Sequence, residues 1–230
     1  MLLQLSDIAL ENANCEFGAD GKMLNGIVDK DGVLCYYVMG CPKMAGLIEI
    51  DGDYYFANGK NGEVAIGKTY VWETNGIALE NANCEFGADG KMLNGIVDKN
   101  GTLCYYVMGR PEMAGLVEID GDYYFANGKN GEVAVGKTHV WEANGLLPEG
   151  TYIFGENGKM LDGFVVENGE IRYYELGTYG KVGLNYIDGS YYFVDYGGKV
   201  WVSGTYYVWE PNGYTIPMSY TFAADGKIVL

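Results

Sequence analysis

Histidine is almost absent from this 230-residue sequence, which contains only His139. The sequence also lacks zinc-type Cys-x-x-Cys and Cys/His spacings, the Gly-x-Ser-x-Gly and His-Glu-x-x-His motifs, and a phosphate-binding loop. Its carboxylates occur in turns such as Asp29 to Asp31 and Asp51 to Asp53. A general acid needs a carboxyl group with a raised pKa, and a short exposed turn offers nothing that would raise it. We therefore expect no catalytic residue, no metal site and no cofactor. A loose calcium site in these turns is the alternative.

Basic charge and long apolar runs are also scarce. Fifteen Lys and Arg residues face 31 Asp and Glu residues, which gives a formal net charge of −16. Such a chain gains nothing from phosphate contacts, so we expect no nucleic acid partner and no binding to an anionic membrane surface. No apolar run reaches the length of a membrane span, so we expect no membrane insertion. The first seven residues lack the basic start and apolar core of a signal peptide.

Helical periodicity is missing as well. No stretch carries apolar residues at i, i+3, i+4 and i+7 over three turns, and glycine recurs every few residues. The sequence instead contains 36 Gly and 21 Tyr. This composition predicts an all-β chain of short strands and many turns.

Internal repetition dominates the sequence. Residues 8–76 recur as residues 77–145 with eight substitutions, a third and more divergent copy covers residues 146–213, and a partial copy covers residues 214–230. Fixed-period repetition of this kind indicates one continuous repeat domain, so we expect residues 1–230 to form a single domain with the partial copy as its cap. We also expect a monomer.

Each copy contains three shorter blocks of about twenty residues, each closed by a glycine such as Gly26. In the first block, strand alternation up to Phe17, a turn at Asp20 and Gly21, and a return strand that Gly26 ends predict a hairpin. The second block is expected to turn through Gly40 to Pro42, and the third through two Asn-Gly pairs. A further short strand, residues 68–73, carries a tryptophan after the third hairpin.

These blocks resemble the cell-wall-binding repeats of Gram-positive surface proteins, which include choline-binding modules, glucan-binding domains and the repetitive binding domains of clostridial toxins. The matching segments are the aromatic strands at residues 51–56, 120–125 and 188–193 and the turns at residues 20–26 and 89–95. The resemblance covers residues 8–230. It implies a β-hairpin solenoid of about nine hairpins plus a terminal cap, with about three hairpins per superhelical turn and ligand pockets between hairpins.

The resemblance does not extend to choline specificity. In choline-binding members a tryptophan after the closing glycine helps to build an aromatic cage for a quaternary ammonium. Here the corresponding residue is never tryptophan; it is Ile27, Leu47 or Lys68 in the first copy. The implied cage is therefore incomplete at every step.

Aromatic residues supply the candidate ligand sites. In the Tyr70-Val71-Trp72 segment, strand alternation places both rings on one face, which suits the apolar face of a sugar. Among paired tyrosines, alternation assigns Tyr37 and Tyr54 to the core and Tyr36 and Tyr55 to the outer side. The alternative is that all these rings pack against the adjacent hairpin. The candidate ligand-binding residues are Tyr36, Tyr55, Tyr70, Trp72, Tyr105, Tyr124, His139, Trp141, Tyr173, Tyr192, Tyr207 and Trp209.

One substitution distinguishes the first two candidate sites. Tyr70 of the first copy is replaced by His139 in the second. Because histidine titrates near neutral pH, we expect these two sites to differ in affinity or in pH response.

Five cysteines follow the repeats. Cys15 and Cys35 recur as Cys84 and Cys104, at positions where the family pattern has an inward aromatic residue. In an exported protein, Cys15–Cys35 and Cys84–Cys104 disulfides are one expectation and buried thiols are the other. The fifth cysteine, Cys41, is expected to be an exposed odd thiol.

Two functional hypotheses follow. The first is a non-catalytic module of a secreted or cell-surface protein that binds a cell-wall polymer or another glycan through several weak sites. The second is a structural stalk or adhesin segment, or a protein-docking segment, whose aromatic residues serve only the core. The exposure of Trp72, Trp141 and Tyr36 discriminates between them.

Overall fold

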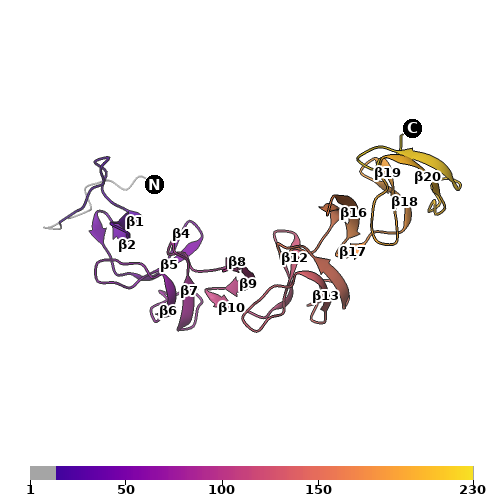
Figure 1. Ribbon diagram of the computed structural model, residues 1–230. Helices are drawn as coiled ribbons and strands as arrows, with labels where there is room; N and C mark the ends of the chain where they lie inside the picture. The colour runs from indigo at the N-terminus through magenta and orange to yellow at the C-terminus, as the bar shows by residue number, and fades with distance from the viewer. Residues whose placement is uncertain (1–13, 230) are drawn as a thin grey trace. The chain divides into compact units, whose positions relative to one another are not determined.

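The computed structural model describes residues 14–229, and within this range it contains strands and turns but no helix. No helix in the described part of the chain is therefore long and apolar enough to cross a membrane. The predicted all-β class is confirmed. Figure 1 follows the strands in chain order from β1 to β20.

The strand bounds follow the three copies. The strands are β1 (Gly26–Lys30), β2 (Val33–Val38), β3 (Cys41–Pro42), β4 (Gly46–Ile50), β5 (Asp53–Ala57), β6 (Gly67–Val71), β7 (Ala82–Phe86), β8 (Gly95–Lys99), β9 (Thr102–Val107), β10 (Arg110–Pro111), β11 (Gly115–Ile119), β12 (Asp122–Ala126), β13 (Gly136–Val140), β14 (Gly150–Phe154), β15 (Gly163–Glu167), β16 (Glu170–Glu175), β17 (Thr178–Tyr179), β18 (Gly183–Ile187), β19 (Ser190–Val194), β20 (Gly204–Val208) and β21 (Met218–Phe222).

Antiparallel hairpins are the building unit. Nine sheets lie within residues 14–229, and each is built on one hairpin. The first hairpin of each copy carries a third, two-residue strand, which gives the sheets β1-β2-β3, β8-β9-β10 and β15-β16-β17. The predicted hairpin-repeat fold with about nine hairpins is confirmed, whereas three hairpins per superhelical turn stays a prediction.

Two-residue turns determine the register of the first two hairpins of each copy. At the tip of β1–β2, Asp31 has φ 55° and Gly32 has φ 85°. Positive φ at both positions is the signature of a type I′ turn, whose twist matches that of antiparallel strands. The turn aligns Lys30 with Val33 and Gly26 with Tyr37. Asp31 and Asp51 therefore lie at exposed hairpin tips, whereas Asp29 is in β1 and Asp53 is the half-buried first residue of β5, where it pairs with Lys91.

The closing glycines were assigned to the wrong end of a strand. Gly26 was expected to end a hairpin, but it is the first residue of β1. The segment before it, residues 15–24, forms only a single antiparallel bridge between Phe17 and Met23. Alternation around a turn cannot show which of two adjacent turns joins the longer pair of strands, and this ambiguity caused the error.

The tryptophan-bearing strand was also misplaced. Instead of standing alone after a third hairpin, β6 pairs with β7 of the next copy, and β13 and β20 pair with β14 and β21 in the same way. The boundary between the first two copies, at Gly76, therefore lies inside the loop of one hairpin. The first and last residues that the sequence gives for each copy therefore do not mark boundaries between structural units.

The described chain divides into two compact units. One contains the residues up to Val97 with Tyr105–Glu112, and the other contains Asp98–Cys104 with the residues from Met113 onward. The division falls in the β8–β9 hairpin rather than at a copy boundary. A single domain over residues 1–230 stays a prediction.

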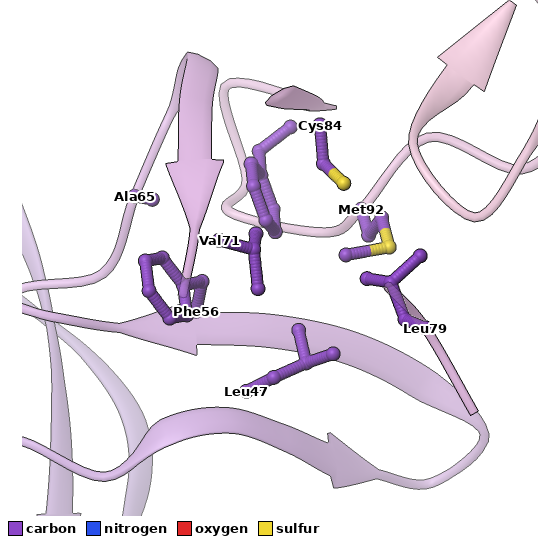
Figure 2. Close-up of a cluster of buried hydrophobic side chains, with 8 residues drawn as sticks. Leu47, Phe56, Ala65, Val71, Leu79, Cys84 and Met92 are labelled. Atoms are coloured by element: carbon purple, nitrogen blue, oxygen red, sulfur yellow. The ribbon is translucent and has the colours of Figure 1, made fainter. Parts of the chain in front are cut away.

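Hydrophobic clusters between successive hairpins form the core of each unit. In the first unit, Leu47 and Phe56 of the β4–β5 hairpin meet Val71 of β6 and Cys84 of β7. Figure 2 shows these side chains converging with Leu79 and Met92. On the opposite face of the same hairpin, Tyr55, Ala57 and Val64 form a second cluster with residues of β1 and β2. A hairpin inside the array is therefore buried on both faces.

Candidate functional site

Trp72 lies just after β6, where the chain leaves the sheet. Val71 before it is fully buried in the core, whereas Tyr70 and Trp72 are each 50% exposed. The indole of Trp72 meets the ring of the buried Phe56 in a T-shaped contact with ring centroids 4.9 Å apart. The indole is thus half-exposed and packed against a buried ring of the core.

The same arrangement recurs in the other two copies. Trp141 is 52% exposed and contacts Phe125 at 5.0 Å, and Trp209 is 43% exposed and contacts Phe193 at 4.6 Å. We name the three pairs Tyr70/Trp72, His139/Trp141 and Tyr207/Trp209 the aromatic platforms. All six residues are exposed, as the sequence predicts, whereas their role in binding stays a prediction.

A polar residue lies across the strand pair from each platform. The register pairs Tyr70 with Asn83, His139 with Thr151 and Tyr207 with Ser219. The Thr151 hydroxyl lies 3.5 Å from His139 Nδ1. Each platform therefore combines an apolar ring face with a neighbouring hydrogen-bonding group, which is the pairing that a sugar ring requires.

An asparagine fixes the loop that carries each tryptophan. Asn75 donates its side-chain N–H groups to the carbonyls of Ala45 and Leu47, the second at 2.9 Å, and the Leu47 N–H donates to the Glu73 carbonyl at 2.8 Å. Asn144 and Asn212 make the corresponding bonds in the other copies. These asparagines were not predicted as site residues, although the recurring Trp-Glu-x-Asn-Gly segment was the available signal.

Close backbone approach accompanies this anchor. A Cβ atom added to Gly115 would lie 2.6 Å from the Glu142 carbonyl oxygen, and Gly115 has φ +72°. Only glycine at this position lets the loop of the β13–β14 hairpin reach the start of β11. The platform is therefore held by backbone bonds on a rigid sheet rather than on a loose loop.

Replacing Asn144 by glycine tests this anchor. Because two carbonyls lose their donor while the left-handed backbone (φ 52°) stays accessible, we expect the free energy of unfolding to fall by about 1–2 kcal/mol. Urea unfolding followed by tryptophan fluorescence measures it. Asn168→Gly is the matched control, because Asn168 has a similar φ of 51° at an exposed hairpin tip. Equal losses in the two variants would contradict the anchoring role.

The outward assignment of Tyr55, Tyr124 and Tyr192 was wrong. These three residues are buried, and Tyr54, which was assigned to the core, is only half-buried. Strand alternation separates core from solvent only when one face of a sheet is covered. Here both faces of the β4–β5 hairpin are covered, and Tyr55 packs in the cluster shared with β1 and β2.

Tyr36, Tyr105 and Tyr173 take an intermediate position. All three are half-buried, and Tyr36 packs against the cluster that contains Tyr55. Burial raises the pKa of the Tyr105 and Tyr173 phenols, which agrees with a partly dry environment. Tyr37, which follows Tyr36 in β2, is buried, as predicted. These rings therefore serve the contacts between hairpins more than the open surface.

The third copy carries a larger aromatic surface than the other two. Trp201 occupies the position of Ala65 and Ala134, stacks on Phe193 at 4.0 Å and meets the edge of Trp209 at 5.0 Å. Tyr206 lies 5.0 Å from Trp201. Two indoles and the Tyr206 phenol thus lie together beside Phe193.

A small cavity also lies in the third copy. It has a volume of about 180 Å³ and is lined by Leu184, Tyr191, Tyr214, Thr215, Tyr220 and Ile228. The Thr215 and Tyr220 hydroxyls are hydrogen-bonded at 2.6 Å, and Tyr191 and Tyr214 meet edge to face at 5.6 Å. These tyrosines could not be predicted from the repeat, because Tyr214 stands where the first copy has Ile77 and the second has Leu146.

Of the two expectations for these cysteine pairs, buried thiols are observed for Cys35, Cys84 and Cys104, and neither the Cys15–Cys35 nor the Cys84–Cys104 disulfide is formed. Cys15, Cys35 and Cys84 carry thiols, and the Cys104 thiol donates to the Thr102 carbonyl at 3.8 Å. Within the described residues no group of three or more His, Cys, Asp or Glu side chains could hold a metal ion. Cys41 is half-buried rather than exposed, so its assignment as an exposed thiol was wrong.

No family model matches this chain, and no curated protein matches it. Among solved structures it is similar to choline-binding protein F from Streptococcus pneumoniae, with 22% identity over 89% of this chain and 78% of that chain and a TM-score of 0.36. It is also similar to CbpJ from Streptococcus pneumoniae, with 16% identity over 88% and 93% of the two chains and a TM-score of 0.39. Alternansucrase in complex with isomaltononaose is a further similar structure, with 20% identity over 92% of this chain and 15% of that chain and a TM-score of 0.40.

Proposed function

We propose that this chain is a non-catalytic module that binds a cell-wall polymer or another neutral glycan through its three aromatic platforms. The observation that carries the proposal is the half-exposed tryptophan that recurs at Trp72, Trp141 and Trp209, each supported by a buried phenylalanine. Rings needed only for the core would be covered, as Phe56 is. We propose a cell-surface or secreted location on the same ground, because cell-wall polymers lie outside the cell.

Charge narrows the ligand class. With a net charge of −16, the chain repels polyanions such as teichoic acids at low ionic strength. A neutral polysaccharide meets no such repulsion and offers the apolar ring faces that stack on indole. Each platform is shallow, so useful affinity arises from several platforms on one polymer.

Three carboxyl groups lack the raised pKa that a general acid requires. Hydrogen bonds from Lys30, Lys199 and Lys227 hold the pKa of Glu16, Glu170 and Asp225, respectively, below its usual range. A general acid for glycoside hydrolysis needs a raised pKa instead. These carboxyl groups stay ionised at neutral pH.

Sedimentation of the intact chain with insoluble glycans tests the proposal. We expect the chain to pellet with a neutral cell-wall glycan or glucan, to be released by soluble oligosaccharides of the same glycan, and to be unaffected by free choline. Retention on a teichoic acid polymer instead would contradict the neutral-ligand class. Failure to pellet with any glycan or wall preparation would favour the stalk or protein-docking function.

The third platform is expected to bind most tightly. Trp201→Ala gives it the alanine that the first two copies have, so we expect the affinity of the tightest site to fall roughly tenfold. Titration of the intact chain with a soluble oligosaccharide, followed by tryptophan fluorescence, measures this loss. Near-ultraviolet circular dichroism controls for the packing of Trp201 on Phe193. An unchanged tightest site in a folded variant would show that Trp201 serves the core alone.

A further inference from the structure

Cys15 and Cys41 are brought together by the backbone of the first copy. The turn between β2 and β3 is formed by Met39 (φ 52°) and Gly40 (φ 76°), and Cys41 follows as the first residue of β3. The Glu16 N–H donates to the Gly40 carbonyl, and the Gly40 N–H donates to the Leu24 carbonyl, both at 2.8 Å. This turn is therefore bonded to the segment that contains Cys15.

Side-chain packing confirms the approach. A Cβ atom added to Gly40 would lie 2.9 Å from the Cys15 Cβ, so Cys15 lies directly against the residue that precedes Cys41. Burial and the side-chain hydrogen bond with Cys41 raise the pKa of the Cys15 thiol. Both cysteines are half-buried, so a small reagent reaches them from solvent.

Cys35 is excluded as the partner of Cys15 by its place on β2. It precedes Val38, the last residue of the strand, by three positions, and at about 3.3 Å per residue it lies roughly 10 Å from the turn that contacts Cys15. Cysteines are bridged only when their Cα atoms lie within about 7 Å. The Cys35 backbone instead pairs with the Glu63 backbone in an isolated antiparallel β-bridge.

The other copies keep this backbone but change the pair. The Glu85 N–H donates to the Gly109 carbonyl at 2.8 Å, and the Ile153 N–H donates to the Gly177 carbonyl at 2.7 Å. In the second copy Cys84 faces Arg110, and in the third the corresponding residues are Tyr152 and Thr178. A pair of cysteines at this position is therefore specific to the first copy.

We propose that Cys15 and Cys41 form an intramolecular disulfide when the chain meets a small-molecule disulfide oxidant such as glutathione disulfide. One cysteine thiolate attacks a sulfur of the oxidant and releases one glutathione thiolate, and the second cysteine thiolate then attacks the mixed disulfide and releases the other. Two cysteine thiols are oxidised, and one glutathione disulfide is reduced to two glutathione thiols, which take up the two protons.

The bond would join the segment around Phe17 to the β2–β3 turn. Within residues 15–24 the only strand contact is the Phe17–Met23 bridge, and Phe17 is exposed, while the Glu16 carboxylate is held by Lys30 and Tyr37. Closing the loop between residues 15 and 41 lowers the entropy of the open state, so we expect hydrogen exchange at the Glu16 amide to slow about tenfold or more on oxidation.

Peptide mapping of the intact chain without reduction tests the proposal. After incubation with glutathione disulfide and alkylation under denaturing conditions, we expect one cross-linked peptide pair that contains Cys15 and Cys41. Cys35, Cys84 and Cys104 are expected to be alkylated. A cross-link between Cys15 and Cys35, or complete alkylation of Cys15 in excess oxidant, would overturn the proposal.

Two variants provide matched controls. Cys41→Ser is expected to abolish the cross-link without touching the core. Arg110→Cys recreates the pair on the corresponding backbone of the second copy, and because Arg110 is exposed we expect a folded chain with a second cross-link, to Cys84. Absence of that second cross-link in a folded Arg110→Cys variant would show that this backbone does not bring residues 15 and 41 to bonding distance.

Discussion

Replacing Trp72, Trp141 and Trp209 together by alanine is expected to lower the retention of the chain on its glycan by roughly a hundredfold or more. Each tryptophan is about half-exposed, and under the proposed function three platforms that engage one polymer contribute more than their separate affinities. A single replacement should therefore cost less than tenfold, and the loss should grow steeply with the second and third. Co-sedimentation over a range of chain concentrations measures the series.

The control for this series is an exposed aromatic residue away from the platforms. Tyr196 is more exposed than any platform tryptophan, yet it lies in the turn after β19. Tyr196→Ala should leave retention unchanged. Each tryptophan also contacts a buried phenylalanine, and the loss of one such contact costs about 0.5–1.5 kcal/mol of stability, so folding is checked by circular dichroism. A folded triple variant that is retained as well as the parent would assign the tryptophans to packing alone.

The fold was predictable because its determinants are local. Aspartate-glycine and asparagine-glycine pairs at the hairpin tips require positive φ at both turn residues, and the first two hairpins of each copy follow from repeating them. The exposure of Tyr70 and Trp72 was also predictable, since Val71 between them is an apolar residue on the opposite face. Both predictions depend only on residues close in sequence.

The errors concern contacts between hairpins. Tyr55 was assigned to the outer side, but the preceding hairpin covers that side, and no pattern within one strand reports it. Similarly, Cys15 was paired with Cys35 from their repeat positions, whereas main-chain bonds between residues 16 and 40 place Cys41 beside it. The Asn75 anchor joins residues 28 and 30 positions apart, so its role needs the three-dimensional arrangement.

Two phenylalanines that lie within identical ten-residue segments test most directly whether the stability of a hairpin depends on the neighbouring hairpin. Residues 15–24 and 84–93 are the same, yet Phe17 is 59% exposed and Phe86 is 3% exposed. Phe86 pairs with Gly67 of β6 and stacks on Phe56 with ring centroids 6.4 Å apart, in the cluster with Leu47 and Val71. No described residue pairs with Phe17 in the way that Gly67 pairs with Phe86.

We therefore expect Phe86→Ala to lower the free energy of unfolding by about 3–5 kcal/mol, because it removes a buried ring and leaves a cavity between two hairpins. Phe17→Ala should change it by no more than about 0.5 kcal/mol, because its ring is already in water. Urea unfolding of the two intact variants, with hydrogen exchange to localise the loss, measures the difference. Equal costs would mean that the ten shared residues set the stability by themselves. A large difference would show that the stability of each hairpin depends on the hairpin that packs against it, as expected for a linear array of repeats.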